Sequence, residues 1–178
     1  DWSTFQAPVD GNDSLTLDYD CDVTFIAYTD SNIIQAFPNS SLEADVNKVV
    51  LRSAWQEHND LVLIQKNSTV SYQSASSNYP DSAYWNIISD GNGAFYLQND
   101  STKDYAALSG SSVTCVSSAD GGNTSWTVDT TMDGARFINT ANENAIINIE
   151  NLTGSAQATK VPFYYTSSQW TFDYSSYD

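Results

Sequence analysis

Three tryptophans recur at nearly equal spacing along this chain, and they constrain its fold more than any other feature. Trp85 and Trp126 lie 41 residues apart, and Trp170 follows 44 residues later. After each of the first two come an apolar residue, an Asp-Gly turn and an aromatic strand that ends in asparagine, within residues 85–99 and 126–139. A period of this length marks one structural unit repeated along a chain. We therefore predict that the tryptophan segments surround a pseudo-threefold axis and share one apolar interior.

Short alternating segments rich in β-branched and aromatic residues fill the repeats, and clusters of Gly, Asn, Asp and Ser separate them. Such alternation is typical of β-strands with one buried face. Residues that favour helices are scarce, so we predict an all-β fold. The predicted strands are residues 94–99, 105–108, 113–117 and 126–129 in the second repeat, and residues 135–139, 145–151, 155–161 and 170–173 in the third.

A first repeat must precede Trp85, and its pattern is less regular. We predict residues 23–29 and 32–37 as its first two strands, which makes this repeat longer than the others. We assign the excess to an inserted hairpin formed by residues 61–66 and 69–73.

The repeats are predicted to form one domain over residues 1–178, with loose ends near residues 1–18 and 175–178. Residues 41–57 have some helix-like content, which allows a turn or two of helix there. The predicted repeat units cover approximately residues 22–88, 89–129 and 130–174.

Four short strands in a unit of about forty residues that ends in tryptophan resemble the β-trefoil pattern of ricin-B-like lectin domains. The resemblance covers residues 85–174 and implies a β-trefoil-like single domain. The alternative is another β-barrel or a β-sandwich. A β-propeller is disfavoured, because three or four units are too few to form one. In place of the Gln-x-Trp triplet of those lectins, this chain has Ala83-Tyr84-Trp85, Thr124-Ser125-Trp126 and Ser168-Gln169-Trp170.

Residues 22–129 also resemble secreted fungal cell-wall proteins, namely the phialide-type wall antigens of moulds and the C-terminal domains of yeast wall proteins with internal repeats. The segments that carry this resemblance are residues 25–35, 59–65, 84–97 and 113–116. The chain differs in having Tyr84 where those proteins tend to have glycine, and in having fewer cysteines. The resemblance implies a wall-associated, non-catalytic protein.

The charge balance limits the partners of the chain. Six Lys and Arg residues stand against 22 Asp and Glu residues, which gives a formal net charge of −16. Such a chain repels phosphate backbones and anionic lipid, so we expect neither nucleic-acid binding nor membrane insertion. The sequence starts at Asp1 without Met or an apolar leader, as expected of a secreted protein after signal removal.

Two further features favour an extracellular location, possibly a cell wall. Cys21 and Cys115 are the only cysteines, and an even number in a secreted chain suggests one disulfide. Six N-x-Ser/Thr sequons suggest a glycoprotein. These candidate glycosylation sites are Asn12, Asn39, Asn67, Asn99, Asn123 and Asn151.

The third repeat combines the side chains that bind sugars. Exposed rings stack on the C–H face of a pyranose, and carboxylate or amide groups hold its hydroxyls. The repeat is similar to those of β-trefoil glucan-binding modules, which implies that Glu150 and Tyr164 or Tyr165 form a sugar site. The second repeat has Tyr96, Asn99 and Tyr105 in loosely corresponding places. The candidate carbohydrate-binding residues are Asn148, Glu150, Tyr164, Tyr165 and Gln169.

Few residues suit catalysis or metal binding. His58 is the single histidine and lies in a polar run that reads as a solvated turn. Asp90 and Asp133 lie in Asp-Gly turns, where such side chains cap their own backbone. The chain has no cluster of His and Cys for zinc and no calcium-loop motif, so we expect no metal and no cofactor.

The sequence therefore predicts a non-catalytic, lectin-like extracellular glycoprotein whose partner is a polysaccharide or other glycan. One alternative is a purely structural or antigenic wall protein. Another is an acid-dependent glycoside hydrolase or lyase, which a pair of carboxylates could support. A protease inhibitor on the same fold is a weaker option.

Overall fold

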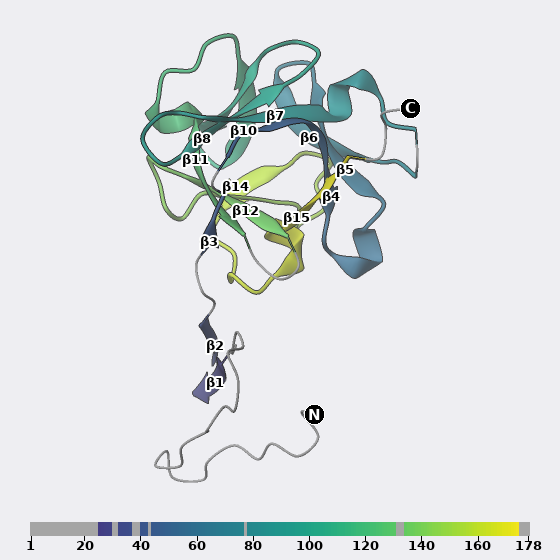
Figure 1. The fold of residues 1–178 in the computed structure, drawn as a ribbon. Helices are drawn as coiled ribbons and strands as arrows, with labels where there is room; N and C mark the ends of the chain where they lie inside the picture. Colours follow the sequence, from purple (N-terminus) through teal and green to yellow (C-terminus); the bar gives the residue numbers. More distant parts are fainter. Residues whose placement is uncertain are drawn as a thin grey trace. The chain divides into compact units, whose positions relative to one another are not determined.

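The computed structural model describes residues 25–29, 32–36, 40–42, 44–76, 78–130 and 134–174. It divides the chain into two compact units, Asp1–Phe37 and Pro38–Asp178, where the sequence predicts one domain over residues 1–178. In the smaller unit, β1 (Phe25–Thr29) and β2 (Asn32–Ala36) form an antiparallel two-stranded sheet (Figure 1). The predicted loose ends lie outside the described residues.

The larger unit is built from short strands joined by turns, which confirms the all-β prediction. In its described residues, four 3-10 turns lie between these strands: η2 (Gln56–His58), η3 (Asp81–Ala83), η4 (Gly122–Thr124) and η5 (Thr166–Ser168). The strands are β3 (Ser40–Ser41), β4 (Val46–Ser53), β5 (Leu61–Lys66), β6 (Thr69–Ser74), β7 (Tyr84–Ser89), β8 (Phe95–Asn99), β9 (Tyr105–Ser109), β10 (Ser112–Val116), β11 (Ser125–Thr130), β12 (Ala135–Asn139), β13 (Ile146–Asn148), β14 (Gln157–Thr159) and β15 (Trp170–Asp173).

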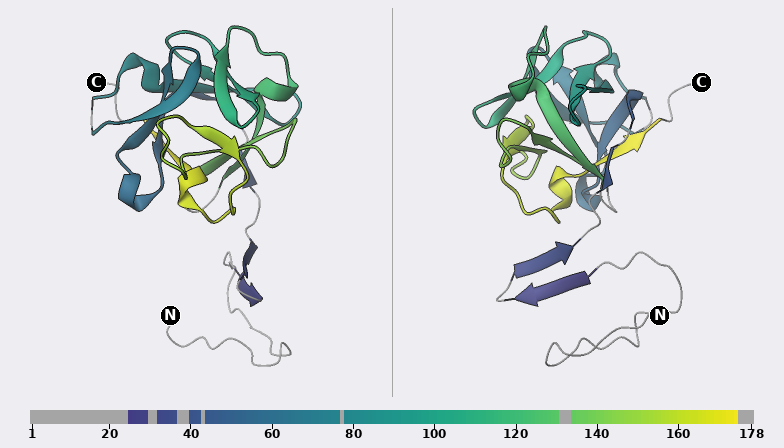
Figure 2. Two further views of the ribbon diagram at one scale, coloured as in Figure 1. Left: turned by 180° about the vertical axis from the view of Figure 1, so that it is seen from behind. Right: turned by 60° about the vertical axis from the view of Figure 1, so that its left-hand side comes forward.

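Six of these strands form a closed antiparallel ring. In order around the ring they are β4, β7, β8, β11, β12 and β15, and β15 pairs again with β4. The hairpins β5–β6, β9–β10 and β13–β14 meet one another, because β10 pairs with both β6 and β14 and Ser71 bridges to Ser155. Figure 2 shows this barrel and its hairpins from two further sides. Twelve of the strands thus form three successive sets of four, β4–β7, β8–β11 and β12–β15, and the short β3 pairs with β11.

The first set differs from the sequence prediction. The strands predicted to open it, residues 23–29 and 32–37, correspond to β1 and β2 of the smaller unit. The set begins instead with β4, in the segment where a turn of helix was allowed. The hairpin predicted as an insertion is β5–β6, the regular second and third strands of this set. The predicted first unit, residues 22–88, is therefore wrong at its start.

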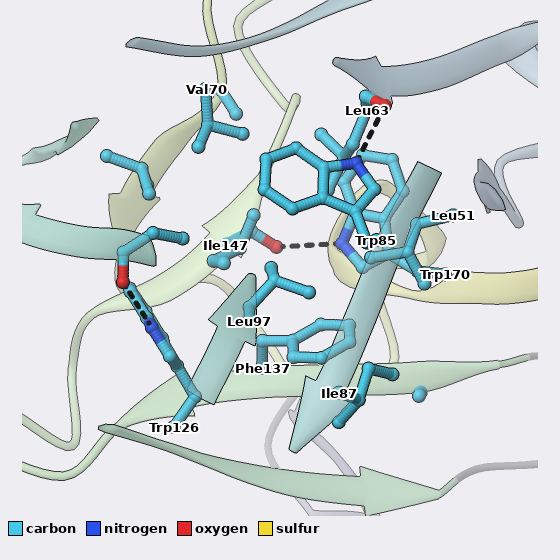
Figure 3. Packing of buried hydrophobic residues seen from close by; sticks show 14 of the residues in the cluster. Leu51, Leu63, Val70, Trp85, Ile87, Leu97, Trp126, Phe137, Ile147 and Trp170 are labelled. Atoms are coloured by element: carbon cyan, nitrogen blue, oxygen red, sulfur yellow. Dashed lines mark hydrogen bonds between the residues drawn. The ribbon is translucent and has the colours of Figure 1, made fainter. Parts of the chain in front are cut away.

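The three tryptophans occupy equivalent places in the core, as predicted. Trp85, Trp126 and Trp170 are each fully buried, and each lies in the last strand of its set. Each indole Nε1 donates to a backbone carbonyl in the second strand of the same set (Figure 3). The acceptors are the carbonyls of Leu63 at 3.0 Å, Ala106 at 3.0 Å and Ile147 at 3.2 Å. Each tryptophan therefore fixes a hairpin to the barrel.

Buried polar side chains join one set to the next. Asn99 and Asn139 lie opposite tryptophans in the barrel and donate through Nδ2 to the carbonyls of Ser82 and Asn123, both at 2.9 Å. Ser53 occupies the same position opposite the third tryptophan. A buried amide without such partners would be destabilising, so these bonds fix the contacts between sets.

Replacement of Trp126 by Phe tests the role of the indole. The change leaves the carbonyl of Ala106 without its donor and creates a cavity, so we expect the free energy of unfolding to fall by about 2–4 kcal/mol. Urea denaturation measures this value. Tyr174→Phe, which changes an exposed ring, is the control and should stay within about 0.5 kcal/mol of the unsubstituted protein. Equal stability of the two variants would contradict the role of the indole.

Candidate functional site

Two of the predicted sugar-binding residues are inaccessible. Asn148 is 0% exposed, and its Nδ2 donates to the carbonyl of Ile146 and to Oγ1 of Thr159, both at 2.9 Å. Gln169 is 2% exposed, and its Nε2 donates to the carbonyl of Phe163 at 3.1 Å. These amides satisfy backbone groups inside the fold, so the prediction of sugar contacts for Asn148 and Gln169 is wrong.

The other three predicted residues reach the surface. Tyr164 and Tyr165 are 37% and 38% exposed in the loop between β14 and β15. Glu150 is partly exposed in the turn after β13. The amide of Ile149 donates to the carbonyl of Ser167 at 3.0 Å, which ties the turn of Glu150 to the turn that follows Tyr165. We call Glu150, Tyr164 and Tyr165 the tyrosine surface.

The two tyrosine rings are held in place by local contacts. The ring of Tyr164 packs edge-to-face between Phe163 and Tyr165, with centroid distances of 5.6 and 5.2 Å. The amide of Tyr165 donates to the carbonyl of Pro162 at 3.0 Å, and its carbonyl accepts from Oγ of Ser168 at 2.9 Å. Rings fixed before binding lose little conformational entropy when a ligand stacks on them.

The second repeat does not reproduce this arrangement. Tyr96 and Tyr105 pair edge-to-face at 5.8 Å, but both are only partly exposed, and Asn99 between them in sequence is buried. The candidate surface is therefore a feature of the third repeat.

The structure adds a group that the sequence prediction missed. Trp55 is partly exposed just after β4, and its Nε1 donates to Oε2 of Glu57 at 3.2 Å. His58, predicted to lie in a solvated turn, is partly exposed in η2 and lies edge-on to the indole with ring centroids 4.4 Å apart. A comparison of the repeats could have revealed Trp55, but the wrong start of the first repeat concealed its position.

Among the described residues, hydrogen bonds shift the pKa values of three carboxyl groups. The Ser125 hydroxyl, with the amides of Asn92 and Ala94, lowers the pKa of Asp90. These bonds confirm that Asp90 caps its own turn, while Asp133 lies outside the described residues.

The other two carboxyl groups shift in the same direction. The Ser74 hydroxyl lowers the pKa of Asp60, and Lys103 together with Asn86 lowers the pKa of Asp100. Each of the three carboxyl groups thus stays ionised to lower pH than an ordinary one. Within the described residues, no group of three or more His, Cys, Asp or Glu side chains could hold a metal ion.

The predicted disulfide would join a buried cysteine to one outside the described residues. Within the described residues Cys115 is buried and has no disulfide partner, and burial raises the pKa of its thiol to about 12. Cys21 lies outside the described residues, so the disulfide stays a prediction.

No helix in the described part of the chain is long and apolar enough to cross a membrane.

The predicted glycosylation sites also differ in accessibility. Asn99 is 0% exposed and hydrogen-bonded inside the fold, which is incompatible with a glycan there. Asn67, Asn123 and Asn151 are exposed. Asn12 and Asn39 lie outside the described residues.

No protein-family model and no curated protein matches this chain. Solved structures do match it. The GlcNAcα1-4Gal releasing endo-β-galactosidase from Clostridium perfringens shows a TM-score of 0.64 and 23% identity over 71% of this chain and 32% of the enzyme chain. Polyporus squamosus lectin shows a TM-score of 0.62 and 19% identity over 74% of this chain and 50% of the lectin chain.

A designed 3-fold symmetric protein, ThreeFoil, is also similar. The match covers 70% of this chain and 96% of the designed chain, with a TM-score of 0.58 and 15% identity. This chain thus spans about a third of the endo-β-galactosidase and half of the lectin. These similarities show a shared all-β fold, found in proteins that include lectins and glycoside hydrolases.

The Asp90 hydrogen bonds predict a dependence of stability on pH. Because its pKa is lower in the folded protein than the unfolded value of about 4, ionised Asp90 stabilises the fold above that pH, and the benefit is lost as pH falls through the folded pKa. We expect Asp90→Asn to destabilise the protein by about 1–2 kcal/mol at pH 7 and by less at pH 3.

Urea denaturation at both pH values measures this difference. Glu143→Gln, at an exposed carboxylate, is the control and should be nearly neutral at both. If Asp90→Asn lowers the free energy of unfolding equally at pH 7 and pH 3, the charge of Asp90 does not have the proposed role.

Burial of Asn99 predicts its modification state. In protein purified from a eukaryotic secretory host, we expect peptides containing Asn99 to be unmodified, because a glycan there would prevent the observed packing. Mass spectrometry with enzymatic deglycosylation in ¹⁸O water measures occupancy at each sequon. The exposed Asn67 and Asn151 sequons serve as internal comparisons. Substantial occupancy of Asn99 in folded protein would contradict its burial.

Proposed function

We propose that residues 38–178 form a β-trefoil that binds carbohydrate without catalysing a reaction. A closed ring of six strands and three hairpins, built from three sets of four strands, supports this proposal. The equivalent bonds of the three tryptophans support the same threefold arrangement.

The tyrosine surface carries the binding proposal. Tyr164 and Tyr165 expose more than a third of their surface although each ring is packed in place. The neighbouring turn supplies the carboxylate of Glu150, tied to the same loop by the bond from Ile149. Rings that stack on sugar C–H groups beside an acceptor for hydroxyls are the elements of a carbohydrate site.

One observation favours binding over hydrolysis: the chain matches only about a third of the similar endo-β-galactosidase. Glycoside hydrolysis is the second candidate function, because the similar structures include such enzymes.

The biological setting that we propose is outside the cell, in a fungal wall. The resemblance of residues 22–129 to fungal wall proteins, the exposed sequons and the net charge of −16 are consistent with a secreted glycoprotein. A structural or antigenic role without a sugar site is the alternative in that setting.

Binding to insoluble β-glucan, chitin and mannan tests the proposal. We expect retention on at least one of them, and a loss of about tenfold in affinity for Tyr165→Ala, which removes one stacking ring. Glu150→Gln should weaken binding as well. Tyr174→Ala, at an exposed ring outside the tyrosine surface, is the matched control and should bind normally.

Three outcomes would contradict the proposal. They are no retention on any of the polysaccharides, equal retention of Tyr165→Ala and the unsubstituted protein, and release of soluble sugar from the polysaccharide. The last result would establish the hydrolase function instead.

A further inference from the structure

The turn after β4 repeats a backbone arrangement that the other two sets share. The amide of Trp55 donates to Oγ of Ser53 at 3.1 Å. In the second set the amide of Ser101 donates to Oδ1 of Asn99 at 3.2 Å, and in the third the amide of Ala141 makes the same bond at 3.0 Å. Trp55, Ser101 and Ala141 are therefore equivalent positions. Because serine and alanine serve there, the turn itself does not require an indole.

The Trp55 ring nevertheless has a fixed orientation and is partly exposed to solvent. One part of it packs against the main buried cluster, while the residue as a whole stays partly exposed. Its Nε1 bond to Glu57 and the edge contact with His58 fix the orientation of the ring. The amide of His58 donates to the carbonyl of Trp55 at 2.8 Å, which closes the turn beneath it. A fixed, partly exposed indole beside a carboxylate has the chemistry of a sugar subsite.

This turn lies beside the loop of the tyrosine surface. Ser53 pairs with Trp170, and the amide of Ala54 donates to the carbonyl of Gln169 at 2.9 Å. Figures 1 and 2 show the two short helical turns, blue for η2 and yellow for η5, at the same end of the barrel. The junction between the third and first sets thus carries aromatic rings from both.

We propose that Trp55, with Glu57 and His58, forms a second subsite that lengthens the tyrosine surface, so that the protein binds an extended, uncharged polysaccharide chain rather than a single sugar. This inference rests on the proposed carbohydrate-binding function. The ligand is uncharged because the subsites present Glu57 and Glu150 on a protein of net charge −16, which would repel a uronic-acid chain.

Fluorescence provides a direct readout at this subsite. Among the tryptophans in the described residues, Trp55 alone is not buried, so a sugar stacked on it should change the emission of the protein. The probes are oligosaccharides of two and of six units from β-glucan, chitin and mannan, with hexagalacturonate as the charged control. We expect one six-unit series to bind at least tenfold more tightly than its two-unit form and to shift the emission, and hexagalacturonate not to bind.

Variants then separate the two subsites. Trp55→Ala should abolish the gain in affinity from two to six units. Glu57→Gln, which leaves the indole in place, should reduce that gain in part. Gln56→Ala, at an exposed position of the same turn, is the matched control and should behave like the unsubstituted protein. Thermal unfolding of each variant shows whether the fold is retained, and Trp55→Phe serves in place of Trp55→Ala if the latter unfolds.

The possible failures are distinguishable. If six-unit chains bind but neither the emission nor the affinity depends on the Trp55 turn, the second subsite is overturned and the proposed function stands. If binding depends on Trp55 but not on Tyr165, the second subsite is supported and the tyrosine surface is overturned. If no uncharged probe binds to the protein and its emission never changes, both proposals are overturned.

Discussion

The hydrogen bond from each buried indole to a backbone carbonyl is the interaction on which the rest of this structure depends. An indole N–H without a partner in the core would cost much of what burial of the ring contributes. In each set the acceptor lies in a hairpin strand, so the same bond that satisfies Trp85, Trp126 or Trp170 also fixes that hairpin to the barrel. The same hydrogen bond therefore also positions the loops that follow the hairpins, including the turn of Glu150.

Backbone groups in loops without regular structure still need hydrogen-bond partners. This need explains why several amide side chains are buried rather than exposed. Asn148, Gln169 and Asn99 carry amides that suit sugar hydroxyls, yet each is used to bond a backbone carbonyl in a buried place. Among the aromatic side chains, Tyr165 is exposed and Trp55 is partly exposed, so both remain accessible from outside. The amides act as structural supports beneath the candidate sites.

The first set was predicted wrongly for a local reason. The pairing of β4 with β7 shifts register between Val46 and Val49, and Lys48 has a φ of 50°, so a bulge interrupts the alternation. Val50 then faces a second buried cluster outside the main core. Apolar residues at positions 46, 49 and 50 consequently mimic helical spacing. The regular alternation of β1 and β2 was the stronger strand signal, but it belongs to the smaller unit.

The sequence by itself determined the all-β class, the equivalence of Trp85, Trp126 and Trp170 and the strands of the last two repeats, because alternation and repetition are properties of the chain read locally. Only the tertiary structure decided which polar side chains are buried and which rings stay open, because burial depends on what packs from elsewhere in the chain. The bonds that bring residue 54 to residue 169 and residue 149 to residue 167 join distant segments. No local pattern contains those contacts, and they bring the turn of Trp55 and the loop of Tyr165 to neighbouring parts of the barrel.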